Sequence, residues 1–131
     1  MEVFVEEVRN AGDIEKECVV LKCYGNDVGW PEGYIVFDQT YDADGNESNK
    51  IRHLYIFPDK TKGEGDDVPT YYRWAYGDII ELYTRNGRNR IVKDGTQTVF
   101  KYFWKLGNSV WNSNGDKVTI IKIEDKSEFT I

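Results

Sequence analysis

The amino-acid sequence predicts an all-β protein, built as a β-sandwich or a barrel. Seven or eight short segments have the alternating or β-branched pattern of strands, and Gly, Asn, Asp or Pro residues separate them at fairly regular intervals. No segment offers the helical crossover that a parallel α/β sheet requires between its strands. A chain of 131 residues has room for one core, so we expect a single domain over residues 1–131.

The predicted strands follow one another along the chain, with turn chemistry between them. Residues 1–18 are the best candidate for a helix, but Val3, Val5 and Val8 and a Gly-Asp interruption favour a strand there. We therefore expect mostly antiparallel strands over 2–9, 17–24, 34–39, 50–57, 78–84, 99–104, 109–111 and 117–123. Loops are expected over 59–70 and, with many cations, over 84–95.

The strand patterns also predict which side chains face the core. In the strand over 78–84, Ile80 and Leu82 are expected to point inward, because the other face would bury Glu81. In the strand over 117–123 the apolar residues change faces: Val118 and Ile120 share one face, whereas Ile121 and Ile123 share the other. A β-bulge, or burial of both faces at the middle of the strand, would explain that change.

Cys18 and Cys23 are the only cysteines, and His53 is the only histidine. Two thiols five residues apart in one strand point to opposite faces, so we expect free structural thiols and no disulfide. The three residues are too few for a zinc site. No apolar run is long enough for a membrane span, and the first residues do not read as a signal peptide. We expect no membrane insertion and a cytoplasmic protein by default, or a secreted one if a signal was removed.

The net charge of −6 is spread unevenly along the chain. Residues 1–84 carry a net charge of −10, whereas residues 85–105 hold six cations and one acid, giving +5. An acidic protein repels nucleic acid as a whole, but a local basic segment can act against that trend. One hypothesis is therefore phosphate or nucleic-acid binding by this segment, and the other is a solvated loop. The candidate residues are Arg85, Arg88, Arg90 and Lys93.

Aromatic residues make up 15% of the chain and cluster in two places. One cluster consists of Tyr71, Tyr72, Trp74 and Tyr76, and the other lies within 100–104. Neighbouring residues of a strand point to opposite faces, so some of these rings should lie outside the core. Exposed rings can stack on sugars, while a second core layer is the alternative.

One loop carries oxygen ligands with the spacing of a calcium site: Asp42, Asp44 and Asn46. The calcium-loop pattern also needs a glycine at its sixth position and a glutamate at its twelfth, where Glu47 and His53 stand. We expect a solvated loop and no cofactor, with weak calcium binding as the alternative.

The stretch VWNSNGDKVTI, residues 110–120, predicts a hairpin. Its Asn-Gly pair is the strongest short-range signal for a tight turn. Such a turn would place Trp111 opposite Val118, and Asp116 would accept backbone N–H groups at the mouth of the turn. The turn explains every residue of the stretch except Asn112.

Catalysis finds little support in the sequence. There is no HExxH motif, no Walker loop and no GxGxxG motif before a helix, and the single histidine has no serine signature nearby. We therefore expect a protein that is not an enzyme.

Four motifs, taken in order, resemble the lamin tail domain family. They are GDIEKECVVLKCYG at 12–25, GW at 29–30, YIFPD with YGDIIELYT at 55–59 and 76–84, and VWNSNGDKVTI at 110–120. The last motif is the most specific, because it is similar to the family's W-N-x-x-G-D hairpin. The structural residues that match by motif are Trp30, Trp111, Asn112, Gly115 and Asp116. The chain departs from the pattern at Cys23, where the family often has asparagine, and in the long spacing between Trp30 and Tyr55.

The resemblance covers most of the chain and implies an immunoglobulin-like β-sandwich that recognises a partner. In nuclear lamins this domain contacts proteins and nucleic acid, and its prokaryotic relatives usually accompany secreted or surface hydrolases. We therefore expect a non-catalytic module that binds a protein or a surface polymer. Carbohydrate binding through exposed aromatic rings, and nucleic-acid binding through 85–105, are the alternatives. The sequence leaves the oligomeric state open.

Overall fold

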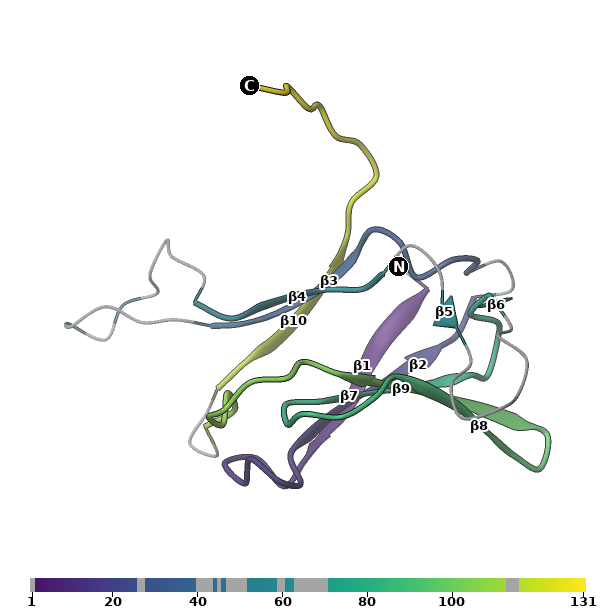
Figure 1. The fold of residues 1–131 in the computed structure, drawn as a ribbon, viewed down its shortest axis with the longest axis horizontal. Coiled ribbons are helices and arrows are strands. Elements are labelled where there is room, and N and C mark those ends of the chain that lie inside the picture. Colours follow the sequence, from purple (N-terminus) through teal and green to yellow (C-terminus); the bar gives the residue numbers. More distant parts are fainter. Residues whose placement is uncertain are drawn as a thin grey trace.

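The protein is an all-β sandwich, as the sequence predicts (Figure 1). The computed structural model describes residues 2–25, 28–39, 44, 46, 52–58, 61–62, 71–112 and 116–131. In these residues every regular element is a strand, and no helix is long and apolar enough to cross a membrane. The two layers are a five-stranded and a three-stranded sheet, and a two-stranded sheet joins β5 (Thr61–Lys62) to β6 (Tyr71–Tyr72).

The larger sheet has the strand order β1-β2-β7-β9-β8. Its strands are β1 (Val3–Arg9), β2 (Cys18–Cys23), β7 (Ile79–Tyr83), β8 (Arg90–Asp94) and β9 (Gln97–Phe103). All neighbours are antiparallel except β7 and β9, which run parallel. A helical crossover is not needed for this parallel pair, because the chain returns through β8 at the edge of the sheet.

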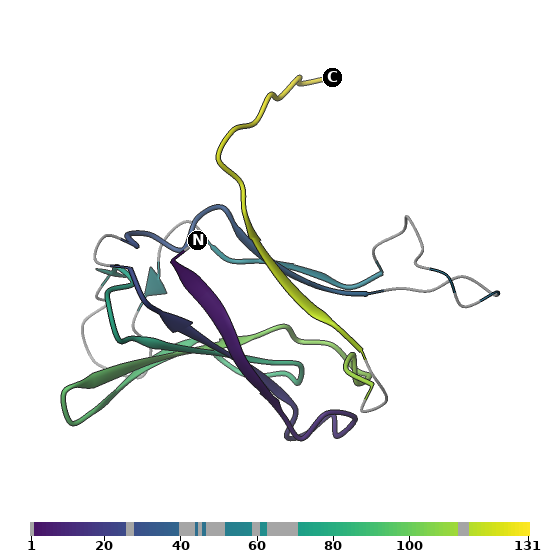
Figure 2. The same ribbon diagram turned by 180° about the vertical axis from the view of Figure 1, so that it is seen from behind.

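The smaller sheet has the order β10-β3-β4 and is antiparallel throughout. Its strands are β3 (Tyr34–Asp38), β4 (Leu54–Ile56) and β10 (Val118–Lys122). After β10, residues 124–131 continue away from the body of the molecule, on the side of this sheet that is remote from β8 (Figures 1 and 2).

The core lies between the two sheets and is rich in aromatic side chains. Tyr34, Phe57, Trp74 and Tyr102 are each at most 2% exposed. The Phe57 ring lies 4.9 Å from that of Tyr102 and 5.1 Å from that of Trp74, both edge to face, and the Trp74 Nε1 group donates to the Tyr102 hydroxyl at 3.1 Å. Burying both polar tips in one hydrogen bond avoids the cost of leaving them unsatisfied.

Several side-chain predictions are confirmed. Ile80 and Leu82 are buried in the core at 0% and 1% exposure. Both cysteines are free and buried. Cys23 belongs to the core cluster, whereas Cys18 alternates with the core residue Val19 and so lies on the other side of β2. Trp111 is also buried in the core, at 2% exposure.

The expected loop over 84–95 is wrong, because it contains β8. Residues 90–94 pair with β9, and Gly95, at φ 64°, starts the two-residue turn that joins them. The cations of this segment suggested a loop, yet charged side chains are typical of edge strands, where they prevent unwanted pairing. The expected loop over 59–70 likewise holds the short strand β5.

The expected strand over 109–111 is absent, and a buried carboxylate holds this segment instead. Glu17 is 0% exposed and accepts the Val110 N–H at 2.9 Å and the Ser109 hydroxyl at 2.9 Å. It also accepts the Gly12 N–H at 3.1 Å and the Thr84 hydroxyl. The polar groups of the segment are therefore satisfied by a side chain, without a neighbouring strand.

The remaining strand predictions are partly correct. The strand expected over 50–57 covers only Leu54–Ile56 among the described residues. β10 pairs with β3 in an unbroken register, so it has no bulge, and Ile121 is 39% exposed. The predicted pairing of Trp111 with Val118 is also wrong, since Trp111 belongs to no strand and Val118 pairs with Asp38 of β3. The predicted turn at 114–115, with Gly115, lies outside the described residues.

Candidate functional site

The outer face of the five-stranded sheet combines charged, aromatic and apolar side chains. It consists of the residues that alternate with the core positions, so they point away from the other sheet. The register places Glu81 of β7 beside Val20 of β2 on one side and Lys101 of β9 on the other, and Lys101 beside Arg90 of β8. A second row runs Lys22, Ile79, Val99 and Val92 across the same four strands.

Glu81 is the centre of a charged network on this face. It is only 7% exposed, although it lies on the outer side of the sheet. Its carboxylate accepts the Arg9 Nη1 group at 3.0 Å and the Tyr83 hydroxyl at 2.9 Å, and the Lys101 Nζ atom lies 3.6 Å away. The sequence suggested that Glu81 would be costly to bury unpaired, and these partners offset that cost.

An arginine lies on two aromatic rings at the end of the same face. The rings of Tyr83 and Phe103 stack at 5.2 Å with an interplanar angle of 15°. The Arg85 guanidinium lies 5.3 Å from the first ring and 5.0 Å from the second. A planar guanidinium suits such stacking, which restricts the position of the charge before any partner binds.

The segment that carries Arg85 is held against the sheet. The Phe103 N–H donates to the Asn89 side-chain oxygen at 3.0 Å, and the Lys105 N–H donates to the Arg85 carbonyl at 3.3 Å. Gly87 lies so close to Phe103 that a Cβ there would stand 2.3 Å from the ring. The first part of the predicted basic loop is therefore a fixed part of the outer face.

The predicted basic residues do not form one surface. Arg85 lies over the aromatic pair, and Arg90 alternates with Ile91, which packs on the core, so it lies on the outer face. Lys93 is two residues from Ile91 and therefore points to the other side of β8. Arg88 is exposed in the turn before β8. Arg85 and Arg90 therefore share the outer face with Lys101 and Glu81.

The predicted aromatic surface is divided as well. Trp74 is 1% exposed and belongs to the core, so it is not available for stacking on a sugar. Tyr76 is 65% exposed. Tyr71 and Tyr72 form β6, which pairs with β5.

The other predicted residues have structural roles or lie outside the described part. Asp116 accepts the Asn112 N–H at 3.2 Å and the Lys117 N–H at 2.9 Å, as expected for the mouth of a turn. Trp30 is 37% exposed and lies under the Arg73 guanidinium at 5.4 Å. Asp42 lies outside the described residues. Asp44 and Asn46 are described only as isolated positions, and the described residues contain no group of three or more metal-ligating side chains.

The environment of the outer face does not activate a nucleophile. Burial, reinforced by the Glu81 charge, raises the pKa of the Cys18 thiol to about 12. Burial is also the main cause that raises the pKa of Tyr83, with further contributions from Cys18 and from the hydrogen bond to Glu81. A thiol and a phenol that stay protonated serve packing and hydrogen bonding better than nucleophilic chemistry.

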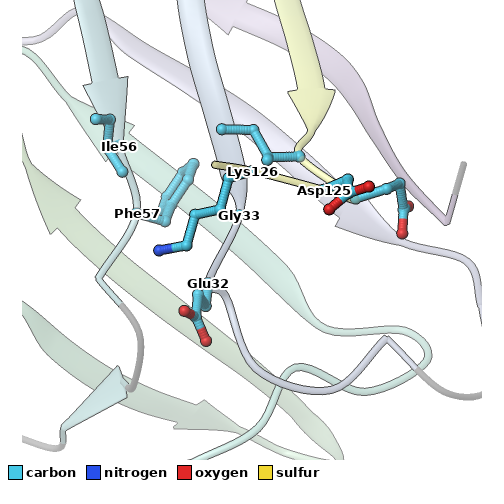
Figure 3. A pocket seen from close by; sticks show the side chains of 8 residues that line it. Glu32, Gly33, Ile56, Phe57, Asp125 and Lys126 are labelled. Atoms are coloured by element: carbon cyan, nitrogen blue, oxygen red, sulfur yellow. The ribbon is translucent and has the colours of Figure 1, made fainter. Parts of the chain in front are cut away.

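A hollow lies at the other sheet. An open hollow of about 600 Å³ is lined by the apolar residues Ile56, Phe57 and Ile123 and by Glu32, Gly33 and residues 124–126. Figure 3 shows Ile56 and Phe57 on one side of the hollow and Asp125 on the other. Three carboxylates against one lysine give this hollow an acidic border.

Comparison with known proteins identifies no relative. No protein-family model matches the chain, and neither does any curated protein or any solved structure.

Sequence reasoning missed the two residues that organise this molecule most clearly. Glu81 was recognised only as a difficult residue to bury, and Glu17 only as part of a motif. The signal for Glu81 was an acid inside an apolar strand, which predicts a paired carboxylate if the strand is central. Its charged partners, Arg9 and Lys101, come from β1 and β9, and no local pattern identifies them.

Proposed function

We propose that the protein is a non-catalytic recognition module that binds a protein partner through the outer face of its five-stranded sheet. The observation that carries this proposal is the fixed Arg85, stacked on Tyr83 and Phe103, on the same face as the exposed Val92. Arginine and aromatic residues are enriched where protein interfaces hold most of their binding energy, and restricted side chains lose little entropy on binding.

The resemblance to the lamin tail domain family supports the same conclusion from the sequence. It implies an immunoglobulin-like sandwich that contacts partners and has no catalytic set. The raised thiol pKa and the fully paired Glu81 agree with a binding role. Nucleic-acid binding is a weaker proposal, because Arg90 and Lys93 point to opposite sides of β8 and Glu81 neutralises part of the outer face.

The test compares two apolar positions of similar exposure on the two sheets. Val92 is 37% exposed on the outer face of the larger sheet, and Ile121 is 39% exposed on the smaller one. Proteins captured by the wild type and identified by mass spectrometry should be lost with Val92→Asp and Arg85→Ala and retained with Ile121→Asp. Equal capture by all four proteins, or a loss specific to Ile121→Asp, would reject the outer face.

Two further measurements separate the alternatives. Binding of an oligonucleotide that falls by orders of magnitude between about 50 and 200 mM salt would favour nucleic acid as the partner. A change of tryptophan fluorescence with members of a glycan panel would favour carbohydrate. For a protein-binding module we expect neither response.

A further inference from the structure

Two features of this chain complement each other: an extended acidic segment and a basic edge strand. Residues 124–131 carry three acids and one lysine, a net charge of −2, and follow β10 without joining a sheet. Phe129 is 90% exposed. β8 is the last strand of its sheet, and among the described residues it pairs only with β9.

The acidic segment continues from β10, an edge strand of the smaller sheet, but belongs to no sheet itself. The Ile123 N–H donates to the Gly33 carbonyl at 2.7 Å, which extends the edge of the sheet by one residue beyond β10. Lys126 and Glu128 then form an ion pair at 2.7 Å, which places both on one side of the segment. In an extended chain this alternation puts Phe129 and Ile131 on the opposite side from Lys126 and Glu128, so the end of the segment has one charged side and one apolar side.

The edge of β8 presents the matching pattern. Val92 and Arg90 point to the outer face, and Lys93 points to the other side. If the segment adds to β8 in an antiparallel direction with Phe129 opposite Val92, Glu128 comes opposite Lys93. The main chain would supply hydrogen bonds along both strands, and the two side-chain pairs would fix the register.

The segment of one copy is directed away from its own β8. In Figures 1 and 2 residues 124–131 rise on the side of the three-stranded sheet remote from the larger sheet. Residues 124–126 line the hollow on their own body, beside Ile56 and Phe57. Residues 127–131, with Glu128 and Phe129, are therefore the part of the segment that extends beyond this hollow.

We propose that residues 124–131 of one copy bind the free edge of β8 in a second copy as an added antiparallel strand. This inference rests on the proposed function, because it uses the edge of the same outer face, and it names the partner as an acidic, apolar extended segment of this chain. Opposite net charges, −2 on the segment and +5 on residues 85–105, assist the encounter.

The first experiment measures the contact directly with a peptide. A fluorescently labelled peptide of residues 122–131, KIEDKSEFTI, is titrated into the full chain and followed by fluorescence anisotropy. We expect saturable binding that weakens about tenfold or more when the peptide carries Phe129→Asp or the protein carries Val92→Asp. Protein with Ile121→Asp is the matched control and should bind the peptide like the wild type.

A charge exchange tests the register. Lys93→Glu in the protein should lower its affinity for the wild-type peptide several-fold. Glu128→Lys in the peptide should restore the affinity for this variant protein. Sedimentation velocity of the full chain should show self-association that rises with concentration and disappears with Phe129→Asp. No peptide binding, no rescue by the exchanged pair, or a loss specific to Ile121→Asp would each overturn the strand addition.

Failure of this inference is distinguishable from failure of the proposed function. If the peptide does not bind, while captured proteins still depend on Arg85 and Val92, the recognition face stands and the second copy is not its partner. If captured proteins are also independent of both residues, the outer face itself is wrong.

Discussion

Glu17 is the residue that joins the most distant parts of the sequence. Its carboxylate accepts hydrogen bonds from the turn after β1, from the end of β7 and from residues 109 and 110. A buried carboxylate without a cation is stable only when donors surround it, and here two backbone N–H groups and two hydroxyl groups do so. One side chain thereby fixes a segment that sequence patterns assign to a strand.

Replacing Glu17 with alanine is expected to lower the free energy of unfolding by about 3 kcal/mol or more, because it leaves several buried donors without an acceptor. Urea unfolding followed by tryptophan fluorescence measures the change. Glu15→Ala is the matched control on the exposed part of the same turn, with an expected change within about 0.5 kcal/mol. Equal effects of the two substitutions would show that the buried carboxylate of Glu17 contributes little to the free energy of unfolding.

At the scale of elements, β8 shapes the outer face of the larger sheet. It completes the outer face, provides its free edge and makes the parallel pairing of β7 with β9 possible by returning the chain. The hairpin that joins β8 to β9 has only two residues between the strands, so its backbone must match the twist of the sheet. Gly95 supplies the positive φ that this turn needs.

Gly95→Ala is expected to destabilise the protein by about 1 kcal/mol, since an alanine at φ 64° is strained even though the space around this glycine is open. Gly107→Ala is the control, because nothing lies within 4 Å of its Cβ position either, and its φ is not positive. Thermal unfolding should therefore show a lower Tm for the first variant only. A similar Tm for both variants would contradict the claim that this turn requires a positive φ at residue 95.

Four strands were predictable from the sequence to within a residue or two: β2, β3, β7 and β10. Each is a short apolar, β-branched or aromatic run bounded by turn residues. β8 was missed since edge strands are selected for charge, which resembles loop composition. The site was less predictable: Arg85 was identified, but its aromatic partners and the network around Glu81 depend on which strands become neighbours.

The whole molecule presents two sheets with different outer surfaces. The larger sheet carries the network of Glu81 and the stacked Arg85, whereas the smaller sheet exposes Leu54, Ile56 and Ile121. The core between them holds the aromatic side chains and one of the two thiols. Because the thiols and phenols are buried in their neutral forms, the sandwich should become less stable at alkaline pH, where these groups ionise in the unfolded chain.

The buried thiols and phenols have raised pKa values. Burial is the main cause that raises the pKa of Cys18 and of Cys23 to about 12, and of Tyr34 and Tyr55 to about 12. In the unfolded chain thiols ionise near about 8.5 and phenols near about 10. The folded state therefore binds more protons than the unfolded state above pH 8.5. Its stabilisation is complete below that pH and falls as the pH rises towards 12.

We expect the free energy of unfolding to fall between about pH 9 and 10 by up to about 1.4 kcal/mol per pH unit for each buried thiol. Urea unfolding at pH 7, 8, 9 and 10 measures this slope. The double variant Cys18→Ala, Cys23→Ala is less stable at neutral pH because it creates cavities. Its stability should be nearly constant up to pH 9 and should fall only towards pH 10, where the buried tyrosines begin to ionise in the unfolded chain. A wild-type stability that does not change up to pH 10, or a wild-type slope between pH 8 and 9 that survives in the double variant, would place the titrating groups elsewhere.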